Sequence, residues 1–408
     1  MKLLQINTSL NTSSTGKIVS QISNMCIDNG DQSFIALSGR YYENRGEANT
    51  FRIGSKLDFY WHALVTRIFD RHGFGSKRAT KKLLKKIEYL KPDIIHLHNL
   101  HGYYINIEIL FNYLSFHKIP IVWTMHDCWA FTGHCSHFEF VECRKWKKAC
   151  YSCPQSSSYP SSFIVDNSKE NFIKKKKLFN SLNNMTIVPV SEWLDNQLRY
   201  SFLNDYDSRV IQNGIDLQIF KPSKSQIFIE DNNLQNKYII LGVASVWTER
   251  KGFFEFIKLR ELLGDEFAIV LVGVSLKLKK MLPQNILSIS RTSNQSQLAM
   301  IYSCSDLYVN LTFEDTFPST NLESIACGTP VLTYKTGGSP ESIFEGSGYV
   351  VNQGDIRSVK NIVEDTKNGV LPKISKKTLV NIANKNFNKD NNFIHYQELY
   401  KEILGTSV

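Results

Sequence analysis

Short apolar runs that end in polar turns alternate with helical stretches along the whole chain. This alternation is typical of parallel α/β sheets, in which each strand is followed by a helix that crosses back over the sheet. In the first half, strands are expected at residues 2–7, 33–38, 93–98, 120–126, 186–190 and 209–212. In the second half, they are expected at residues 238–245, 268–274, 307–311, 330–334 and 348–351. The pattern predicts an α/β protein with two doubly wound, Rossmann-like domains.

A turn signal marks the expected boundary between the two domains. The segment 212–216 contains an Asn-Gly pair, which favours a tight turn. We therefore expect a first domain at residues 1–213 and a second at residues 214–385. The polar stretch 223–236 has the composition of a loop or linker, and a helical segment at about 386–408 ends the chain.

The charge of the chain is concentrated in the first domain. Its 408 residues carry 48 Lys and Arg against 38 Asp and Glu, a net charge of +10, and most of this excess lies in residues 1–213. Part of it belongs to a basic amphipathic helix predicted at residues 76–90. Its apolar stripe indicates an ordinary surface helix packed on the core, whereas its lysines suit a surface of anionic lipid. The two interpretations are compatible.

Composition indicates an ordinary globular protein. Hydrophobic residues make up 42% of the chain and charged residues 21%. The first residues turn polar by Gln5, which predicts a strand and not a signal peptide. No stretch approaches the ~18 consecutive apolar residues of a membrane span. We therefore expect a cytoplasmic protein.

The segment 314–331 carries the most informative pattern in the chain. It places Asp315 and Glu323 on either side of a turn that runs into a helix. Amides at a helix start are unpaired and carry partial positive charge, so they suit a phosphate. A carboxylate can accept hydrogen bonds from both hydroxyls of a sugar diol, so the pattern indicates a nucleotide-sugar site. The other residues expected at this site are Phe317, Pro318, Ser319, Thr320 and Asn321.

This segment, with Gly328-Thr-Pro-Val331 after it, resembles the retaining glycosyltransferases of family 4, which have the GT-B architecture. The family pattern is Glu-x(7)-Glu, and here Asp315 replaces the first glutamate with a side chain one methylene shorter. The resemblance implies that Glu323 holds the ribose hydroxyls and that Asp315 and the amides after it hold the donor sugar. It also implies two domains that face each other across a cleft, with the last helix crossing back onto the first domain.

A basic pair after the first strand of the second domain extends the resemblance. Family members bind the donor diphosphate with a Lys-Gly at this place, and Lys251 matches that lysine. The arginine that usually precedes the lysine by five residues is replaced by Val246. Arg250 could supply the missing charge to a phosphate, although such a pair can also simply open a helix. The segment 336–341, Thr-Gly-Gly-Ser-Pro-Glu, matches the family too.

The first domain offers candidates for the acceptor side. Gly16, between the first strand and a helix, corresponds to a glycine loop that faces the diphosphate and acceptor in the family. His126, at the end of a strand, corresponds to a histidine that contacts the transferred sugar, and Asp127 could orient its ring or bind acceptor hydroxyls. His96 and His98 alternate along a strand and are expected to face opposite ways as structural residues, with His98 a further candidate for acceptor contact.

The resemblance implies front-face attack, in which the leaving diphosphate takes the acceptor proton while the protein supplies position and charge. The implied catalytic residues are His126, Lys251, Asp315 and Glu323. No catalytic cofactor or divalent ion is expected. The implied donor is a UDP- or GDP-sugar, and the implied acceptor is a lipid-linked saccharide at the inner face of the cell membrane. The implied process is bacterial capsule, exopolysaccharide or O-antigen synthesis.

A cluster of cysteines interrupts the family pattern after His126. Cys150 and Cys153 form a Cys-x(2)-Cys pair, which with Cys135 and Cys143 could supply four thiolates to a structural zinc. Cys128 is a spare or substitute ligand. A reducing cytoplasm disfavours disulfides, so the alternative is a set of free, partly buried thiols.

Two other classes of function are compatible with parts of the sequence. Nucleotide-sugar 2-epimerases share the GT-B architecture but need neither an acceptor nor a lipid-facing surface. A zinc-containing nucleic-acid-binding module would explain the basic half and the cysteines, with binding that falls steeply as salt rises. It would leave the donor-site motifs unexplained, so no nucleic-acid partner is expected.

Overall fold

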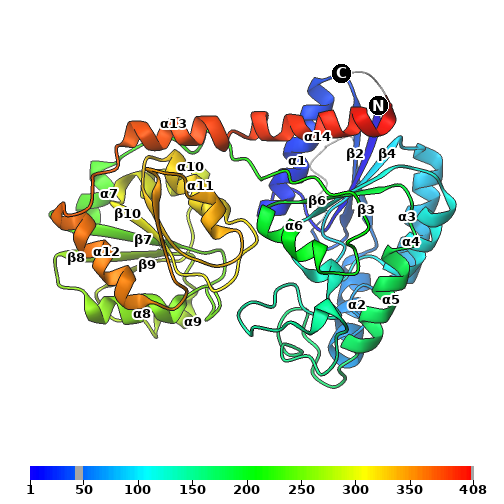
Figure 1. Ribbon diagram of the computed structural model, residues 1–408, viewed down its shortest axis with the longest axis horizontal. Helices are drawn as coiled ribbons and strands as arrows, with labels where there is room; N and C mark the ends of the chain where they lie inside the picture. The colour runs from blue at the N-terminus through cyan, green and yellow to red at the C-terminus, as the bar shows by residue number, and fades with distance from the viewer. Residues whose placement is uncertain (42–48, 406–408) are drawn as a thin grey trace. The chain divides into compact units, whose positions relative to one another are not determined.

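The structure of the chain is a computed structural model that describes residues 1–41 and 49–405. The chain divides into two compact units, which are distinguished in Figure 1 by the colours along the ribbon. The first unit comprises Met1–Gln212 and the C-terminal segment from Phe393 onward, and the second comprises Asn213–Asn392. Each unit contains its own parallel sheet.

The first unit alternates strands and helices in chain order. These are β1 (Lys2–Asn7), α1 (Ser14–Asp28), β2 (Gln32–Ser38), β3 (Thr50–Ile53), α2 (Lys56–Phe69), α3 (Lys77–Leu90), β4 (Ile94–Leu97), α4 (Ile107–Phe116), β5 (Ile121–Met125), the 3-10 helices η1 (Trp129–Phe131) and η2 (Lys145–Lys147), α5 (Ser168–Phe179), β6 (Met185–Pro189) and α6 (Glu192–Arg199). Its six strands have the order β3-β2-β1-β4-β5-β6. Every pairing is parallel, so all the carboxyl ends lie at one edge.

The second unit repeats this plan. Its elements are α7 (Gln226–Asp231), β7 (Tyr238–Val243), α8 (Phe253–Leu262), β8 (Phe267–Val272), α9 (Leu276–Lys279), β9 (Ile286–Ile289), α10 (Gln295–Cys304), β10 (Leu307–Asn310), α11 (Ser319–Ala326), β11 (Val331–Tyr334), η3 (Ser339–Ser342), β12 (Gly348–Val351), α12 (Ile356–Asn368) and α13 (Lys376–Asn386). The strand order is β12-β11-β10-β7-β8-β9, again all parallel.

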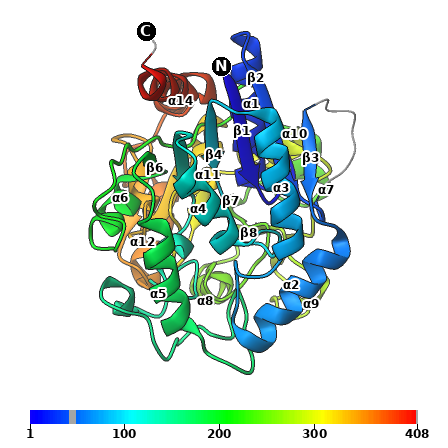
Figure 2. The same cartoon turned by 90° about the vertical axis from the view of Figure 1, so that its right-hand side faces the viewer.

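The last helix, α14 (Lys389–Leu404), begins in the second unit and ends in the first. Its buried face, Phe393, Tyr396, Leu399 and Tyr400, shares a core cluster with Leu3 of β1 and with apolar residues of α1. Helices α3, α4 and α5 lie beside one another on the first sheet, as Figure 2 shows. Helices therefore cover both faces of this sheet, which explains why its central strands are apolar on both sides.

The strand pattern expected from the sequence is confirmed, with three differences. Edge strands β3 and β9 were not expected, because each is short and buries one residue. The expected strand at 209–212 is wrong: the chain there runs beside β6 and forms only an isolated bridge at Ser208. The expected linker at 223–236 contains helix α7. These are marginal elements, with too few buried residues for periodicity to detect.

The basic amphipathic helix is confirmed as α3. Ala79, Thr80, Leu83, Ile87 and Leu90 are its buried residues, and the lysines of the helix are exposed. The apolar stripe therefore faces the protein core. Among the helices of the described residues, none has both the length and the apolar character needed to cross a membrane.

Candidate active site

Three neighbouring strands of the second sheet bring their carboxyl ends together. β7 lies between β10 and β8, and β10 lies between β7 and β11. The β7 strand is followed by Arg250 and Lys251, the β10 strand by Asp315, and the β11 strand by the glycine pair Gly337-Gly338. Strands β8 and β9 lie on one side of β7, and β10, β11 and β12 lie on the other. The strand order therefore reverses between β7 and β10, and such a topological switch point is where α/β sheets bind ligands.

Lys251 and Asp315 are in direct contact. The Lys251 Nζ donates to Asp315 Oδ2 over 2.6 Å, and the two side chains are 26% and 22% exposed. Gly252 makes this approach possible: its φ is +79°, and an added Cβ would lie 2.2 Å from the carbonyl oxygen of Leu311. The loop after β7 therefore packs closely against the loop after β10, and it holds the cation and the acid at the surface of the sheet edge.

Arg250 is engaged by the neighbouring acid. Its Nε lies 3.4 Å from Glu314 Oε1, and its Nη1 donates to the Glu314 carbonyl over 3.4 Å. Glu314 is only 1% exposed, so the arginine compensates a buried carboxylate. The amide of Phe313 donates to the Arg250 carbonyl over 2.8 Å. Arg250 thus ties the two loops together. Sequence reasoning gave Glu314 no such role, and no local signal marks this pair.

Helix α11 begins at Ser319, four residues after Asp315. Its N-cap is Pro318, which provides no side-chain hydrogen bond to the first turn. Among the residues predicted here, Phe317 is buried, and Ser319 and Thr320 are half-buried. The side chain of Asn321 is used within the fold, because it accepts from Asn310 and donates to Ser342, each over 2.9 Å. The amides of the first turn lie at the positive end of the helix dipole, where α/β proteins commonly bind anions.

Glu323 lies in the second turn of α11. It is 8% exposed, and the hydroxyl of Tyr302 donates to its Oε2 over 3.3 Å. A largely buried carboxylate needs polar partners, and Tyr302 is one of them. The structure therefore brings Lys251, Asp315 and the start of α11 to one edge of the sheet, with Glu323 one turn further along the helix.

The glycine pair after β11 completes this edge. Gly337 has φ +50°, and the amide of Gly338 donates to the carbonyl of Asp315 over 3.1 Å. The hydroxyl of Thr336 donates to the carbonyl of Phe313 over 2.7 Å. The β11 loop therefore fixes the backbone that carries Asp315.

His126 follows β5 at the carboxyl edge of the first sheet. Its Nε2 lies 3.3 Å from Nδ1 of His98, whose Nε2 lies 3.1 Å from Oε1 of Gln5. Burial lowers the pKa of His126 to about 4, so its ring is neutral at neutral pH. The chain of contacts fixes the orientation of the imidazole. Gln5, a polar residue inside an apolar strand, is the sequence signal that could have revealed this network.

The expectation that His96 and His98 face opposite ways is wrong. Their ring centroids are 4.0 Å apart. Successive side chains of a strand alternate between its two faces, so residues two apart share a face, and His98, directly after β4, lies on the same side as His96. His96 is structural, as expected: its ring nitrogens form hydrogen bonds with the hydroxyls of Tyr400 and Thr124, over 2.6 and 2.7 Å.

Asp127 pairs with a histidine other than its sequence neighbour. Its Oδ2 lies 2.7 Å from Nε2 of His101, and its Oδ1 accepts from the amide of Trp129 over 2.9 Å. Burial opposes ionisation, but His101 and these hydrogen bonds outweigh it and lower the pKa of Asp127 to about 2. The carboxylate is therefore ionised beside His101.

Gly16 lies in the first turn of α1 and not in the loop before it, as was expected. Its amide donates to the N-cap hydroxyl of Ser13 over 3.0 Å, so that amide is already used. An added Cβ would lie 3.1 Å from backbone atoms of Ser9 and Asn11. The structure thus shows Gly16 packed tightly against the loop that follows β1.

The four cysteines proposed as metal ligands lie together. Cys135, Cys143, Cys150 and Cys153 all line one cavity of about 20 Å³, whereas Cys128 is not among its lining residues. None of these cysteines forms a disulfide. Within residues 1–41 and 49–405, no group of three or more His, Cys, Asp or Glu side chains has the geometry of a metal site.

Two families match adjoining parts of the chain. Residues 43–219 match Glycosyltransferase Family 4, and residues 224–377 match Glycosyl transferases group 1. A curated relative is WcaC of Escherichia coli (strain K12), whose name assigns it to colanic acid biosynthesis as a glycosyl transferase. It is 23% identical over 303 residues, or 71% of each chain.

Solved structures share the fold over nearly the whole chain. Sucrose-phosphate synthase from Thermosynechococcus elongatus has a TM-score of 0.73 at 15% identity, covering 99% of each chain. Anabaena Alr3699/HepE, solved in complex with UDP, has a TM-score of 0.69 at 14% identity, covering 98% of this chain and all of the other. With both family matches and two parallel six-stranded sheets, this chain belongs to the GT-B glycosyltransferases of family 4.

Proposed function

We propose that this chain transfers a sugar from a nucleotide-diphosphate sugar to a saccharide acceptor, with retention of anomeric configuration, in the synthesis of a bacterial surface polysaccharide. The observation that carries the proposal is the group at the carboxyl edge of the second sheet. A lysine, an acid and an uncapped helix start are adjacent there, with Glu323 in the next helical turn. The relationship to WcaC supports the polysaccharide assignment.

The donor would lie on the second unit with its diphosphate at Lys251 and the first amides of α11. Glu323 would accept hydrogen bonds from the ribose hydroxyls, and Asp315 would hold the transferred sugar. A UDP- or GDP-sugar fits these groups. The structures of Alr3699/HepE in complex with UDP and with UDP-glucose support a uridine nucleotide.

In the proposed reaction, the acceptor oxygen attacks the anomeric carbon on the face from which the diphosphate leaves. The diphosphate takes the acceptor proton as the bond to it breaks. Lys251 and the helix amides stabilise the charge that develops on this leaving group, in a site that needs no reorganisation. Because these groups already supply positive charge, we expect no divalent ion in catalysis.

The acceptor would bind to the first unit near His126. The neutral imidazole can exchange a hydrogen bond with a sugar hydroxyl without placing a charge beside it, and the contact with His98 holds the ring in place. Asp127 is a second candidate for acceptor hydroxyls, because its carboxylate is ionised and partly exposed.

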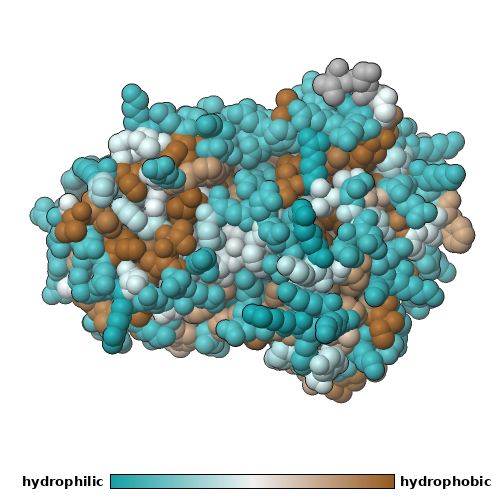
Figure 3. Space-filling model, viewed as in Figure 1, coloured by the Kyte–Doolittle hydropathy of each residue, from teal (hydrophilic) through white to brown (hydrophobic). Residues whose placement is uncertain are grey.

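A lipid-linked acceptor at the inner membrane face is supported by two surfaces of the first unit. Arg71, Lys77 and Lys174 line a cavity of about 240 Å³, which suits an anionic headgroup. The neighbouring helix α2 exposes apolar side chains, among them Trp61, which is 67% exposed. Figure 3 shows apolar surface at the lower end of this unit, where Figure 1 places α2. Exposed aromatic residues beside basic residues are typical of membrane interfaces.

Vesicle sedimentation tests this surface. The protein should bind vesicles that contain anionic lipid but not neutral ones, and Trp61→Ser should weaken binding while leaving nucleotide binding unchanged. Equal binding to both kinds of vesicle would contradict the proposed surface.

The transfer reaction itself is tested by following nucleotide release from UDP- and GDP-sugars, with and without a lipid-linked saccharide extract. Release that depends on the acceptor, with the donor's anomeric configuration kept in the product, would support a retaining transferase. Epimerisation of the donor sugar without an acceptor would instead identify a 2-epimerase.

A further inference from the structure

The segment Thr132–Asn167 has little regular structure. It connects η1 to α5, and η2 is its only helix or strand; the structure describes all of its residues. Segments of this length without regular structure are uncommon inside compact domains, and ordering them costs conformational entropy. Most of the segment nevertheless follows a defined path, with Trp146 only 1% exposed and packed on Phe131 and Phe138. One small aromatic cluster is a modest core for so long a loop.

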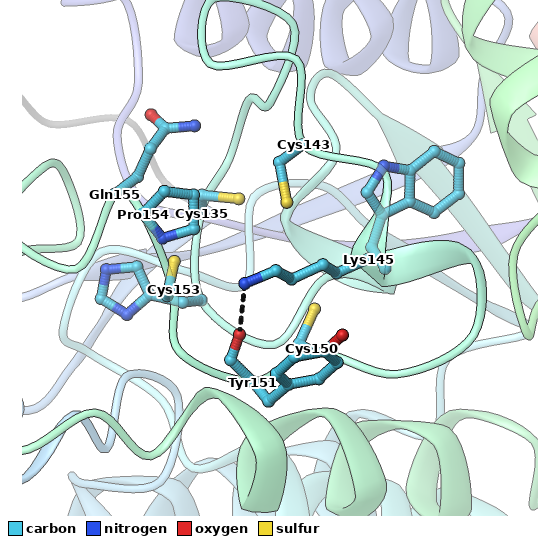
Figure 4. A pocket seen from close by; sticks show the side chains of 10 residues that line it. Cys135, Cys143, Lys145, Cys150, Tyr151, Cys153, Pro154 and Gln155 are labelled. Carbon is cyan, nitrogen blue, oxygen red and sulfur yellow. Dashed lines mark hydrogen bonds between the residues drawn. The ribbon is translucent and has the colours of Figure 1, made fainter.

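The cysteines form a second centre within this segment. Figure 4 shows the thiols of Cys135, Cys143, Cys150 and Cys153 around a common space. Cys135 and Cys153 are hydrogen-bonded to each other through their sulfurs. The enclosed volume of about 20 Å³ is enough for one water-sized particle.

The backbone holds one of these thiols in place. The amide of Gly133 donates to Cys150 Sγ over 3.1 Å, and an added Cβ on Gly133 would lie 2.7 Å from the Cβ of Cys150. The absence of a side chain at Gly133 therefore lets the amide reach the sulfur.

A histidine supplies an independent indication of a missing partner. His134 lines the same cavity, and its side chain is completely buried. Its Nδ1 lies 2.6 Å from Oδ1 of Asp70. In the described part of the chain, its Nε2 is buried and has no hydrogen-bond partner. A buried polar atom without a partner is rare in folded proteins and indicates that something else occupies its surroundings.

We propose that Cys135, Cys143, Cys150 and Cys153 bind one structural Zn²⁺ ion, with His134 beside the ion–sulfur cluster. Four thiols would lose four protons, and the resulting four thiolates would hold the ion in a tetrahedral set. The sulfurs surround the cavity without yet having metal-site geometry, so binding requires them to move inward to about 2.3 Å from the ion.

The surroundings suit the charge of such a centre. Four thiolates and Zn²⁺ carry a net charge of −2, which buried surroundings must compensate. The Nζ of Lys145 enters the cavity region in Figure 4, where it donates to the carbonyls of Tyr151 and Ser152 over 3.1 and 3.0 Å. Lys175 donates to the carbonyls of Trp129 and Thr132 at the start of the segment. Because all four ligands come from the protein, the ion would hold the loop together and leave no open position for chemistry.

Elemental analysis of the full chain, purified without a metal-binding tag, tests the proposal. We expect about one zinc per chain in the wild type and in Cys304→Ser, a control in which the altered buried cysteine lies in the second unit. We expect the zinc to be lost in Cys143→Ser and in Cys150→Ser. Absence of stoichiometric zinc from the folded wild type, or unchanged zinc content in both cluster variants, would overturn the proposal.

A second measurement uses only the wild type and so does not depend on how the variants fold. After removal of the metal with a chelator, Co²⁺ added to the full chain should produce the thiolate-to-cobalt absorption of a tetrahedral sulfur site. The chelated protein should also expose four additional thiols to a thiol reagent and become sensitive to proteolysis within residues 132–167. Failure to produce the cobalt absorption, or a Cys135–Cys153 disulfide in the protein as isolated from reducing cells, would refute the zinc site.

Discussion

The Nζ of Lys251 lies 2.6 Å from Oδ2 of Asp315. The cation proposed for the donor diphosphate is therefore paired with the acid proposed for the donor sugar. Both side chains are partly exposed, so the pair is screened by solvent and contributes little to stability. In the proposed function, this pair prepares the site: Asp315 would hold the lysine near the start of α11 until a diphosphate replaced the acid as its partner.

Lys251→Ala should weaken nucleotide-diphosphate binding about 10- to 100-fold. Hydrogen bonds to charged groups contribute about 1.5–3 kcal/mol, and the substitution also leaves Asp315 without its cation, near the incoming phosphates. Calorimetric titration with the nucleotide measures the effect. Lys258→Ala is the matched control, because Lys258 is a 59% exposed lysine that pairs with Glu255 within helix α8. Equal affinities for the two variants would show that Lys251 does not contact the diphosphate.

Asp315 replaces the glutamate of the family pattern. Two substitutions therefore test it, one that removes its charge and one that restores the family residue. Asp315→Asn should lower kcat/KM about 100-fold, the scale of losing one preorganised polar contact in a transition state, while nucleotide binding is maintained because Lys251 is released. Asp315→Glu should remain active, because the longer acid restores the family residue. Transfer kinetics with the identified donor measure both. Full activity of the asparagine variant would exclude Asp315 from the reaction.

Acidification should destabilise the first unit between about pH 6.5 and pH 4. Burial lowers the pKa of His62 and His126 to about 4 and that of His96 to about 3. These histidines take up protons in the unfolded chain at about pH 6.5 but not in the folded chain, so stability is lost as pH falls through this window. His134 has the opposite effect on stability. Burial lowers its pKa, but Asp70 outweighs burial and raises it, so protonation of this one histidine favours the folded chain.

Urea unfolding at pH 7 and pH 5 measures this effect. Each buried neutral histidine should contribute a loss of up to about 2 kcal/mol over that interval, since one pKa unit corresponds to about 1.4 kcal/mol. A variant with His96→Gln should show a smaller difference between the two pH values than the wild type. A midpoint that does not change with pH would contradict the neutral, buried state of these rings.

Tyr400→Phe should destabilise the attachment of α14 to the first sheet. The hydroxyl of Tyr400 forms a 2.6 Å hydrogen bond with Nδ1 of His96, and both side chains are completely buried. Loss of one partner leaves the ring nitrogen unsatisfied, at a cost of about 1–3 kcal/mol. Chemical denaturation measures the change. Tyr89→Phe is the control, because the side chain of Tyr89 in α3 is 80% exposed. Indistinguishable stabilities of the two variants would show that this hydrogen bond contributes nothing.

The fold and the donor residues could be predicted because their signals are local. Apolar runs of strand length and the spacing of Asp315 and Glu323 are visible within single segments of the sequence. The Lys251–Asp315 pair joins residues 64 positions apart, and the His96–Tyr400 contact joins residues 304 apart. Such contacts depend on strand order and on how loops meet at the sheet edge, which periodicity does not reveal.

The errors at two individual residues have different, local causes. His98 was expected to face away from His96, although residues two apart on a strand share a face. Gly16 was expected in a loop, but the hydroxyl of Ser13 caps α1 ahead of it, so the helix has already begun at the glycine. For Gly16, the position of an element boundary, set by one hydrogen bond, decided where the residue lies.

Calorimetric titration with UDP, GDP and dTDP tests the central claim most directly, using the wild type and Glu323→Ala side by side. We predict that one nucleotide binds the wild type in the micromolar range and that the variant loses this binding while remaining folded. Absence of binding by all three nucleotides, or equal binding by the variant, would contradict a donor site at the start of α11.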